Sequence, residues 1–436
     1  MENMICENIG VNDAHLTFAG IDTTELAKKY QTPLYLMDED RIRHNCRVYK
    51  NAMKEFFSED SFPLYAGKAA CFSRIYKIMK EENMGIDLVS PGEICTAAKA
   101  GFPMERSFFH GNNKTDWDIA YAMENGVGYF MVDNMCELQA IDSLAAEKGI
   151  CQKVILRLTP GIDPHTYAAV ATGKVDSKFG IAIETGQAEQ FVKEALSYKN
   201  VEIAGYHCHV GSQVFDEDGT VYLDAATIML EFSADMYKKY ALSAKILNMG
   251  GGFGVRYTES DPTMDIRANI EKLASHIKST ASRLGIPMPQ VLMEPGRSIV
   301  ADAGMTLYSV GTLKEITGYK NYVSIDGGMT DNPRFALYGS AYTLYLANRM
   351  NEKADFVCDV VGRCCESGDI IQPGVKMPKP KRGDIVAVCT TGAYNYSMAS
   401  NYNRIPRPPI VMISGGKDYV AVKRESFLDL MANDVL

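Results

Sequence analysis

The sequence predicts a (β/α)8 barrel followed by an all-β domain. Three observations support this fold class. Short apolar segments alternate with helical patterns between residues 62 and 295, the alternation occurs eight times, and helical patterns become rare after residue 303. Alternating strands and helices indicate a parallel sheet, and eight repeats favour a closed barrel over an open sheet. The G-x-G-x-x-G fingerprint typical of the open alternative does not follow any of these strands.

The eight expected strands are short and apolar, and most end in a glycine, a proline or a polar residue. They cover residues 62–69, 85–90, 107–111, 129–133, 153–159, 201–210, 245–249 and 291–294. In a barrel of this kind, the groups that carry chemistry lie at the carboxyl ends of the strands. The polar residues at these ends are therefore the first candidates for a functional site.

The remaining segments have the composition of strands. Val, Ile and Tyr are frequent in four of them, with turns between, which is typical of an all-β domain; these are residues 305–326, 355–362, 383–391 and 409–422. We expect residues 33–303 to form the barrel and residues 304–436 to form the β domain. Residues 1–32 do not fit the barrel repeat, and we expect them to contribute to the β domain.

Composition excludes several classes of function. The chain has 436 residues, 46% of them hydrophobic, enough for two domains with sizeable cores. A net charge of −9 argues against nucleic acid as a partner. We find no apolar run long enough for a membrane span and no pattern of a signal peptide at the start. The 11 cysteines are irregularly spaced and lack a CxxC pair, so we expect reduced thiols and a cytoplasmic protein.

Lys68 ends the first expected strand, in the segment FPLYAGKA. Its neighbours Ala66, Ala69 and Ala70 predict a poorly solvated ammonium group, a lowered pKa and an amine that can act as a nucleophile. A lone lysine at a strand end is more often a surface cation with a buried stem. The prediction therefore depends on the motifs that follow.

The segment GYHCHVGSQ ends the sixth expected strand. His207 and His209 are two residues apart and share one face of the strand, so they could bind zinc, with His110 as the one further histidine at an expected strand end. This ligand set is incomplete. We favour the alternative that one imidazole packs on a planar ring, while Gly211 and Ser212 offer donors to an anion.

Two motifs follow the last two expected strands. The glycines of MGGGFG, residues 249–254, let an oxyanion approach the backbone, and loops at this place in a barrel commonly bind phosphate. EPGR, residues 294–297, places Glu294 where a buried carboxylate needs a partner. A protonated ring nitrogen would serve, and Arg297 or Arg157 is the structural alternative. Arg297 could instead bind a substrate carboxylate.

Three polar loops of the β domain add further candidates. They are DGGMTDNPRFALYG (326–339), with Arg334 and Tyr338, GRCCESGD (362–369) and TGAYNYSMASNYN (391–403). We expect the three loops to converge on the mouth of the barrel.

Together, the motifs resemble those of the fold-type III pyridoxal-phosphate-dependent decarboxylases, whose fold is like that of alanine racemase and ornithine decarboxylase. The resemblance covers nearly the whole chain, and the motifs occur in order: TPLYLMD, YAGKA, SPGE, LRLTPGIDPHTY, TGKVDSKFGI, HCHVGSQ, GGGFG, EPGR, DGGM, CESGD and GAYNYSMASNYN. It implies bound pyridoxal 5'-phosphate and a homodimer with active sites at the interface. Within the family, the motifs are most similar to those of enzymes that convert meso-2,6-diaminopimelate to L-lysine and CO2, the last step of lysine biosynthesis.

The resemblance implies roles for the residues around the cofactor. Lys68 would be the Schiff-base lysine, His209 would stack on the pyridine ring, and Glu294 would pair with the ring nitrogen. The other cofactor contacts would come from Ser212, Gly252, Gly296, Arg297 and Tyr394. The motif of the second strand, with Asp87, Ser90 and Glu93, is also present.

The resemblance also implies how the substrate is bound. The thiol of Cys365 would protonate the substrate carbon, and Cys365 and Glu366 would reach into the partner's site. Substrate contacts, including charge pairs for a zwitterionic distal end, would come from Arg297, Arg334, Tyr338, Glu366 and Tyr394. The sequence departs from the family at Thr330, Phe335 and Arg363, where Asn, Pro and Pro are usual. None of these removes a proposed ligand, but Arg363 adds a cation near the substrate end.

Three alternatives are open. A decarboxylase of D-lysine, D-ornithine or a carboxylated polyamine is disfavoured by Arg334, Tyr338 and CESGD. An amino-acid racemase is disfavoured by Glu294, because racemases of this fold commonly place arginine at the ring nitrogen. A non-catalytic carrier of pyridoxal phosphate would resemble the barrel alone, and residues 304–436 argue against it.

Overall fold

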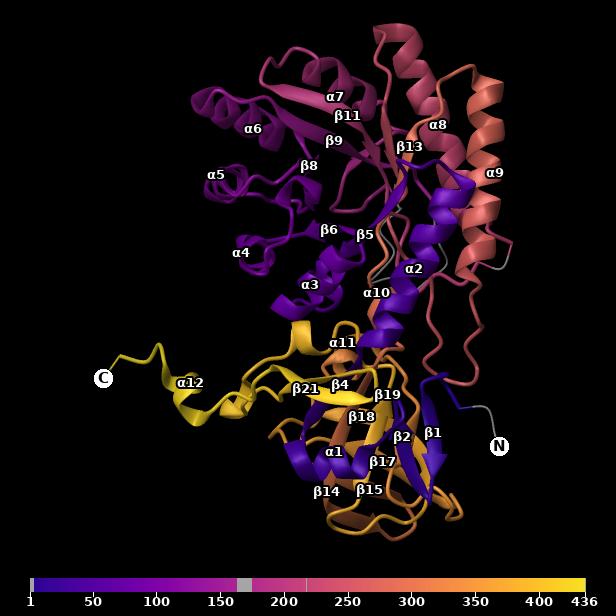
Figure 1. Ribbon diagram of the computed structural model, residues 1–436, viewed down its shortest axis with the longest axis vertical. Coiled ribbons are helices and arrows are strands. Elements are labelled where there is room, and N and C mark those ends of the chain that lie inside the picture. The colour runs from indigo at the N-terminus through magenta and orange to yellow at the C-terminus, as the bar shows by residue number, and fades with distance from the viewer. Residues whose placement is uncertain (1–3, 163–174, 217, 436) are drawn as a thin grey trace. The chain divides into compact units, whose positions relative to one another are not determined.

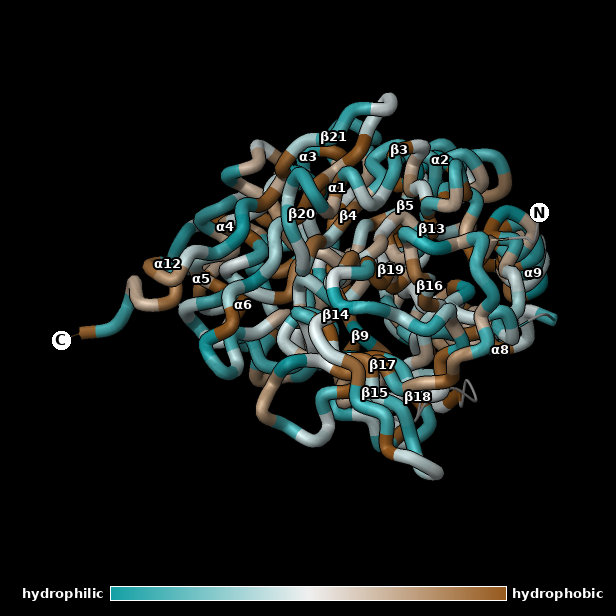
Figure 2. The backbone as a smooth tube through the Cα atoms, turned by 90° about the horizontal axis from the view of Figure 1, so that it is seen from below, coloured by the Kyte–Doolittle hydropathy of each residue, from teal (hydrophilic) through white to brown (hydrophobic). Residues whose placement is uncertain are grey.

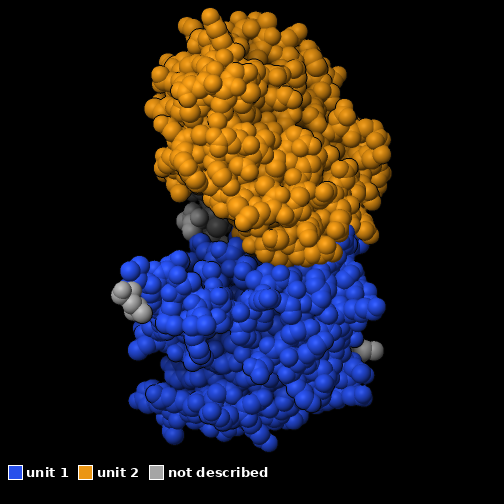
Figure 3. All heavy atoms as spheres, turned by 60° about the vertical axis from the view of Figure 1, so that its left-hand side comes forward, with its two compact units in different colours: residues 1–44, 255–263, 297–436 blue, residues 45–254, 264–296 orange. Residues whose placement is uncertain are grey.

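The computed structural model describes residues 4–162, 175–216 and 218–435. Parts of two sequence motifs, residues 163–167 and 172–174, lie outside the described residues. The chain forms two compact units, distinguished by colour in Figure 3. Unit 1 comprises residues 1–44, 255–263 and 297–436, and unit 2 comprises residues 45–254 and 264–296. The domain boundaries expected from the sequence, after residues 32 and 303, stay predictions.

Unit 2 is a closed barrel of eight parallel strands (Figure 1). Neighbouring strands pair in parallel, β9 pairs with β8 and β11, and β13 pairs with β5, which closes the sheet. The eight strands expected from the sequence are confirmed: β5 (Phe62–Ala66), β6 (Gly85–Leu88), β7 (Ser107–Phe109), β8 (Tyr129–Val132), β9 (Gln152–Thr159), β11 (Val201–His207), β12 (Ile246–Asn248) and β13 (Gln290–Met293). The short strand β10 (Ile181–Ala182) pairs with β9.

Helices connect the barrel strands and cover the outside of the barrel (Figure 1). Their ends follow local chemistry: the Ser90 hydroxyl accepts a hydrogen bond from the amide of Glu93 at the start of α4, and Gly149 ends α6 in the left-handed conformation. The helices are α3 (Ser73–Glu81), α4 (Pro91–Lys99), α5 (Asp116–Glu124), α6 (Met135–Lys148), α7 (Gln187–Ala195), α8 (Thr220–Tyr240) and α9 (Ile266–Leu284). The first boundary between the units falls within α2 (Glu39–Phe56).

Apolar side chains form a buried core cluster from seven of the barrel strands. These side chains are Leu64, Phe108, Met131, Ile155, Ala204, Ile246 and Leu292, all at most 4% exposed. The ring of Phe108 stacks on that of Tyr129, with centroids 4.5 Å apart. Because this core excludes water, polar side chains of the strands can be solvated or can bind a ligand only at the strand ends.

Unit 1 is built mainly of strands. The long strand β14 (Gly304–Ile316) pairs with β4 (Leu34–Asp38), β15 (Lys320–Ile325) and β19 (Ile385–Cys389). The main sheet has the order β18-β17-β15-β14-β4-β20-β21. The other strands are β16 (Leu344–Leu346), β17 (Phe356–Val361), β18 (Ile370–Met377), β20 (Ile410–Ser414) and β21 (Lys417–Val422). The hydropathy of each residue can be followed along the backbone in Figure 2.

The N-terminal residues of the chain contribute to unit 1. Strand β4 lies between β14 and β20 in the main sheet. A small sheet precedes it, made of β1 (Ile9–Asn12), β2 (His15–Phe18) and β3 (Ile21–Asp22) and followed by α1 (Thr23–Tyr30). Among the described residues, no helix is both long and apolar enough to cross a membrane.

Gly205 tests the packing of the barrel. A Cβ atom there would lie 1.9 Å from the carbonyl oxygen of Ile246 on the neighbouring strand. Gly205→Ala should therefore lower the free energy of unfolding by at least about 3 kcal/mol. Urea denaturation measures this loss. Gly92→Ala is the control, because the nearest atom would lie at 3.6 Å; equal stability of the two variants would contradict the close approach of β11 and β12.

Candidate active site

Each barrel strand provides a polar side chain at or near its carboxyl end. Seven of these side chains belong to residues that are at most 9% exposed, and the eighth, Lys68, is exposed. In chain order they are Lys68, Asp87, His110, Asp133, Arg157, His207, Asn248 and Glu294. The sequence analysis did not propose Asp133 or Asn248, although their positions at strand ends could have indicated them.

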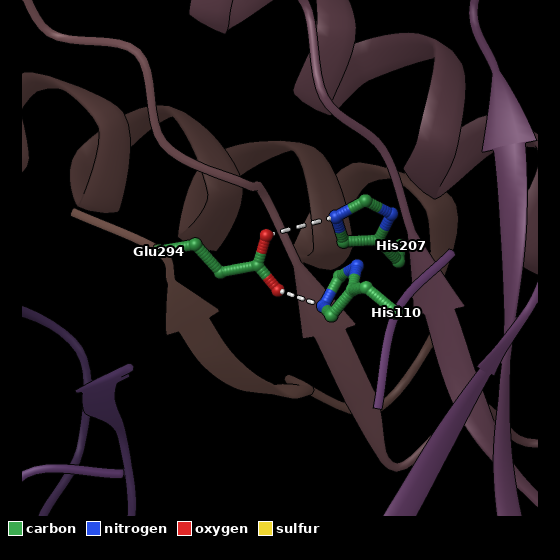
Figure 4. Close-up of side chains that lie close together, drawn as sticks. All are labelled: His110, His207 and Glu294. Atoms are coloured by element: carbon green, nitrogen blue, oxygen red, sulfur yellow. Dashed lines mark hydrogen bonds and ion pairs between the residues drawn. The ribbon is translucent and has the colours of Figure 1, made fainter. Parts of the chain in front are cut away.

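The carboxylate of Glu294 is surrounded by nitrogen donors (Figure 4). Nε2 of His110 lies 2.9 Å from Oε1, and Nε2 of His207 lies 3.1 Å from Oε2. The side-chain amide of Asn248 donates to Oε1 at 2.7 Å. Arg157 is the alternative partner that the sequence offered for Glu294. Its Nε lies 3.8 Å from Oδ1 of Asp133. Two imidazoles and an amide therefore hold this carboxylate within unit 2.

The electrostatics of this group favour an ionised carboxylate. Burial alone would raise the pKa of Glu294, but the adjacent His110 and His207 outweigh burial and hold that pKa well below its usual range. Burial lowers the pKa of His207 to about 4, so its ring is neutral at pH 7. Glu294 is therefore an anion that accepts hydrogen bonds in an almost dry environment.

The same group has the composition of a metal site. The ligand atoms of His110, His207 and Glu294 lie within 4.8 Å of one another, whereas the pair considered for zinc from the sequence was His207 and His209. However, buried Nδ1 of His207 has no hydrogen-bond partner among the described residues. A metal-bound imidazole normally donates its other N–H to an acceptor. The arrangement favours an Nε2–H of His207 that donates to Glu294 over a bound metal ion.

Lys68 lies in the 3₁₀ turn Gly67–Ala69, directly after β5. Ala66, Ala69 and Ala70 are buried, but the side chain of Lys68 is exposed. The prediction that this lysine is buried was therefore wrong, because β5 ends at Ala66 and Lys68 already belongs to the turn. Burial therefore does not explain a nucleophilic amine at Lys68.

The glycine loop packs closely against the residues that follow β11. A Cβ atom at Gly252, where φ is +118°, would lie 2.1 Å from the carbonyl oxygen of Gly211. A Cβ atom at Gly250 would lie 2.7 Å from Nδ1 of His209. Only glycine allows this approach, which brings the backbone close to the imidazole of His209 and to Ser212 in the same segment.

His209 is half-buried beside this loop. Its Nδ1 accepts a hydrogen bond from the amide of Gly251 at 3.3 Å. Burial, together with the cations of Lys68 and Arg157, lowers the pKa of His209 well below its usual range. The ring is therefore neutral, with its proton on Nε2. A neutral flat ring of this kind suits stacking on a planar ligand.

Gly296 follows β13 and packs against the end of β5 and the turn after it. A Cβ atom at this position would lie 2.9 Å from Cβ of Ala66 and 3.2 Å from Cβ of Ala69. The backbone at Gly296 therefore packs directly against the turn that carries Lys68. This contact links the end of β13 to the end of β5.

In unit 1, two buried guanidinium groups share one aromatic ring. Arg297 and Arg334 lie 4.9 and 5.4 Å from the ring centroid of Tyr394. Arg297, the first residue of α10 (Arg297–Val300), donates to the hydroxyl of Tyr257 at 2.8 Å. Tyr394 has a φ of +60°, which is unusual for a non-glycine residue and common at functional sites. The sequence analysis missed Tyr257, since no motif includes it.

Arg334 begins α11 (Arg334–Tyr338) and lies 5.3 Å from the ring of Tyr338. It donates to Ser340 at 3.4 Å, and its buried Nε has no hydrogen-bond partner among the described residues. Buried donors of this kind normally have an acceptor. The guanidinium group therefore has donor capacity for an anionic ligand.

Cys365 and Glu366 lie in the turn between β17 and β18, and both are exposed. The neighbouring thiol of Cys364 is half-buried, and burial together with Asp369 raises its pKa to about 12. Of this adjacent pair, Cys365 is the accessible thiol. The expectation that the loops of the β domain converge on the barrel mouth stays a prediction.

Comparison with known proteins identifies the family. Residues 39–301 match the family described as "Pyridoxal-dependent decarboxylase, pyridoxal binding domain". The chain belongs to this family.

Relatives match over nearly the full length of the chain. The diaminopimelate decarboxylase of Bacillus subtilis is 43% identical over 423 residues, which are 97% of this chain and 95% of the relative. A solved diaminopimelate decarboxylase of M. jannaschii in complex with L-lysine has a TM-score of 0.91 and 32% identity, with 100% and 99% of the two chains covered. A lysine/ornithine decarboxylase of Vibrio vulnificus with putrescine has a TM-score of 0.75 and 25% identity, with 90% and 97% covered.

The cofactor of the family, pyridoxal phosphate, fits the residues present. The glycine loop leaves no room for a Cβ atom at Gly250 or Gly252, and Gly252, its half-buried member, packs against the segment that carries Ser212, where a phosphate could be held. The neutral ring of His209 offers a flat surface, and Glu294 offers an ionised carboxylate. The sequence-based expectations of the cofactor and of the barrel fold are therefore confirmed.

The neutrality of His207 predicts a pH dependence of stability. An unfolded imidazole binds a proton below about pH 6.5, whereas the folded ring does so only below about 4. Stability should therefore fall as the pH is lowered from 6.5 to 4, by up to ~3 kcal/mol from this residue. His207→Gln should remove this part of the slope in urea denaturation at several pH values.

The exposed residue His44 provides the control, since His44→Gln changes a side chain whose surroundings differ little on folding. This variant should keep the wild-type slope. A wild-type slope in His207→Gln as well would contradict a neutral buried imidazole at this position.

Proposed function

We propose that the protein decarboxylates meso-2,6-diaminopimelate to L-lysine and CO2, the last step of lysine biosynthesis. The observation that carries this proposal is the pair of buried guanidinium groups, Arg297 and Arg334, on the ring of Tyr394. A decarboxylase that forms a simple diamine has no distal carboxylate to bind. The near full-length similarity to diaminopimelate decarboxylases supports the same substrate.

The residues of unit 2 hold the cofactor in this proposal. Bound pyridoxal phosphate supplies an electron sink for the charge left on carbon when CO2 departs. Lys68 binds it covalently, and the neutral ring of His209 stacks on it. Glu294, kept ionised by its histidine neighbours, holds a proton on the ring nitrogen. Ser212, Gly252, Gly296 and Tyr394 would hold the cofactor's phosphate.

The residues of unit 1 recognise the substrate in this proposal. Arg334, with Arg297 and Tyr338, binds the distal carboxylate, and Glu366 binds the distal ammonium group. The accessible thiol of Cys365 donates the proton to carbon. Cys365 and Glu366 act in the site of a second subunit, so the active form is a homodimer. The cytoplasm is its proposed location, which the 11 cysteines support, because the structure places none of them in a disulfide.

The alternatives have weaker support. The lysine/ornithine decarboxylase of Vibrio vulnificus has a TM-score of 0.75, against 0.91 for the M. jannaschii diaminopimelate decarboxylase. An amino-acid racemase is disfavoured by an anionic Glu294 in the place where a cation would be needed. We therefore keep diaminopimelate as the proposed substrate.

Arg334 tests the substrate. Arg334→Ala should lower kcat/KM for meso-diaminopimelate by at least about a hundredfold, since a buried carboxylate would lose its charged partner. The wild type should have a much lower kcat/KM for L-lysine and L-ornithine than for meso-diaminopimelate. In Arg334→Ala, this difference in kcat/KM should be smaller. Release of CO2 from each substrate measures the values. Equal use of lysine and diaminopimelate by the wild type would contradict the proposed substrate.

A mixing experiment tests the shared site. Lys68→Ala removes the covalent attachment and Glu366→Ala removes the ammonium partner, so each homodimer should be inactive. An equimolar mixture should regain about a quarter of the wild-type activity, because half of the dimers are mixed under statistical exchange and each mixed dimer has one intact site of two. Subunit exchange is verified with differently tagged chains. No recovery after verified exchange would place both residues in the same site of one chain.

A further inference from the structure

The CESGD motif contains a buried carboxylate, Asp369, for which the proposed reaction has no direct use. We infer that Asp369 is a positioning residue that fixes the loop of Cys365 and Glu366 against the loop that leads to Arg334. The inference deepens the proposed function, on which the roles of these three residues rest.

The two loops follow the carboxyl ends of two neighbouring strands in unit 1, β15 and β17 (Figure 1). Strands β15 and β17 run parallel, with Val323 opposite Val360 and Ser324 opposite Val361. Their carboxyl ends are therefore adjacent. Residues 326–333 follow β15 and lead into α11, and residues 362–369 connect β17 to β18. The strand pairing therefore places the two loops side by side. Other contacts are needed to fix their backbones.

Asp369 joins the two loops with its two carboxylate oxygens. Oδ1 accepts a hydrogen bond from the amide of Met329 at 2.6 Å, and Oδ2 accepts one from the amide of Cys364 at 2.8 Å. Asp369 is only 3% exposed. A buried carboxylate that receives one amide from each loop fixes both backbones at once.

The backbone of Asp369 closes the turn around Cys365 and Glu366. Its amide donates to the carbonyl oxygen of Glu366 at 3.1 Å, and its carbonyl oxygen accepts from the amide of Gly362 at 2.9 Å. The turn is thereby held at its start and at its end. The side chains of Cys365 and Glu366 remain exposed, while the backbone that carries them is held from within the unit.

Two glycines provide the room for this carboxylate. A Cβ atom at Gly328 would lie 2.5 Å from Oδ2 of Asp369, and one at Gly362 would lie 2.2 Å from the same atom. Any larger residue at either place would displace the carboxylate. The glycines of DGGM and of GRCCESGD therefore serve the same contact.

Further hydrogen bonds connect a third loop, residues 391–403, to these two. The side-chain oxygen of Asn403 accepts from the amide of Cys365 at 2.8 Å, and the amide of Ser400 donates to the carbonyl oxygen of Thr330 at 2.8 Å. The amide of Arg363 donates to the carbonyl oxygen of Gly327 at 3.0 Å. The loops at residues 326–333, 362–369 and 391–403 are thus connected by hydrogen bonds, and the buried carboxylate of Asp369 joins the first two of them.

Positioning matters for the reaction because proton transfer and charge recognition depend on placement within a fraction of an ångström. A thiol on a loosely held turn would donate its proton in fewer encounters. A loosely held Glu366 would bind the distal ammonium group less well. Loss of Asp369 should therefore lower kcat and raise KM, as loss of the placed groups themselves would.

Asp369→Asn is the test, because it keeps the size of the side chain and offers one acceptor where two amides now donate. Asp359→Asn is the matched control. Asp359 is also buried, at 6%, and accepts from Lys320 at 2.8 Å and Gly374 at 2.9 Å, residues outside both loops. Both variants should lose similar thermal stability. Asp369→Asn should lose at least about tenfold in kcat/KM for meso-diaminopimelate, and Asp359→Asn less than about twofold.

A double-mutant cycle separates positioning from general destabilisation. If Asp369 acts through the turn, the losses of Asp369→Asn and Glu366→Gln should be strongly non-additive in the combined variant. Additive losses, or equal losses in Asp369→Asn and the Asp359→Asn control, would overturn the inference.

A second readout does not depend on the reaction. Alkylation of Cys365 by iodoacetamide in the substrate-free holoenzyme, followed by peptide mass spectrometry, should be at least roughly threefold faster in Asp369→Asn than in the wild type and the control. Unchanged alkylation would contradict the positioning role. If the wild type fails to release CO2 from meso-diaminopimelate but the alkylation rates differ as expected, the proposed function fails and the inference about the loops stands.

Discussion

A buried carboxylate held by an amide and two imidazoles is the interaction on which the site in the barrel depends. Glu294 accepts from Asn248 and lies at 2.9 and 3.1 Å from the two imidazoles, while its exposed fraction is only 7%. A buried anion without such donors would take up a proton. With them, it remains charged and can stabilise a positive charge on a ligand. The side chains around Glu294 thus determine whether its carboxyl group is ionised.

The closed barrel makes this grouping possible. Its interior is filled by apolar side chains, and its strands end together at one rim. Residues far apart in the sequence, such as His110 and Glu294, meet there because β7 and β13 belong to the same sheet. The glycine loop after β12 completes the arrangement, since its backbone packs against the segment that carries His209. One architectural constraint therefore brings an anion, neutral rings and a closely packed glycine loop to a single place.

Much of this could be predicted from the sequence. The eight barrel strands were found because each is a short apolar run between helical patterns, and the order of motifs gave the family. The glycine loop and Glu294 were found because glycine clusters and buried acids are rare enough to stand out.

Other features depend on contacts that a local pattern does not contain. His207 was paired with His209, two residues away, but the structure brings it to His110, across the barrel. Tyr257 has no distinctive local sequence, and Asn248 is marked only by its place at a strand end, so the importance of both comes from the side chains that they contact. The burial expected for Lys68 failed because β5 ends at Ala66, three residues before the expected end at residue 69, so that Lys68 lies in the turn that follows.

The central claim is that Glu294 is ionised in its buried position. The direct measurement is the ¹³C NMR signal of the Glu294 side-chain carboxyl in protein labelled at glutamate Cδ, identified by its absence in Glu294→Gln, between pH 8 and 5. Because its donors keep Glu294 ionised, we expect the signal to stay at the position of an ionised carboxylate over this whole range. A shift to the position of the protonated acid within this range would contradict it.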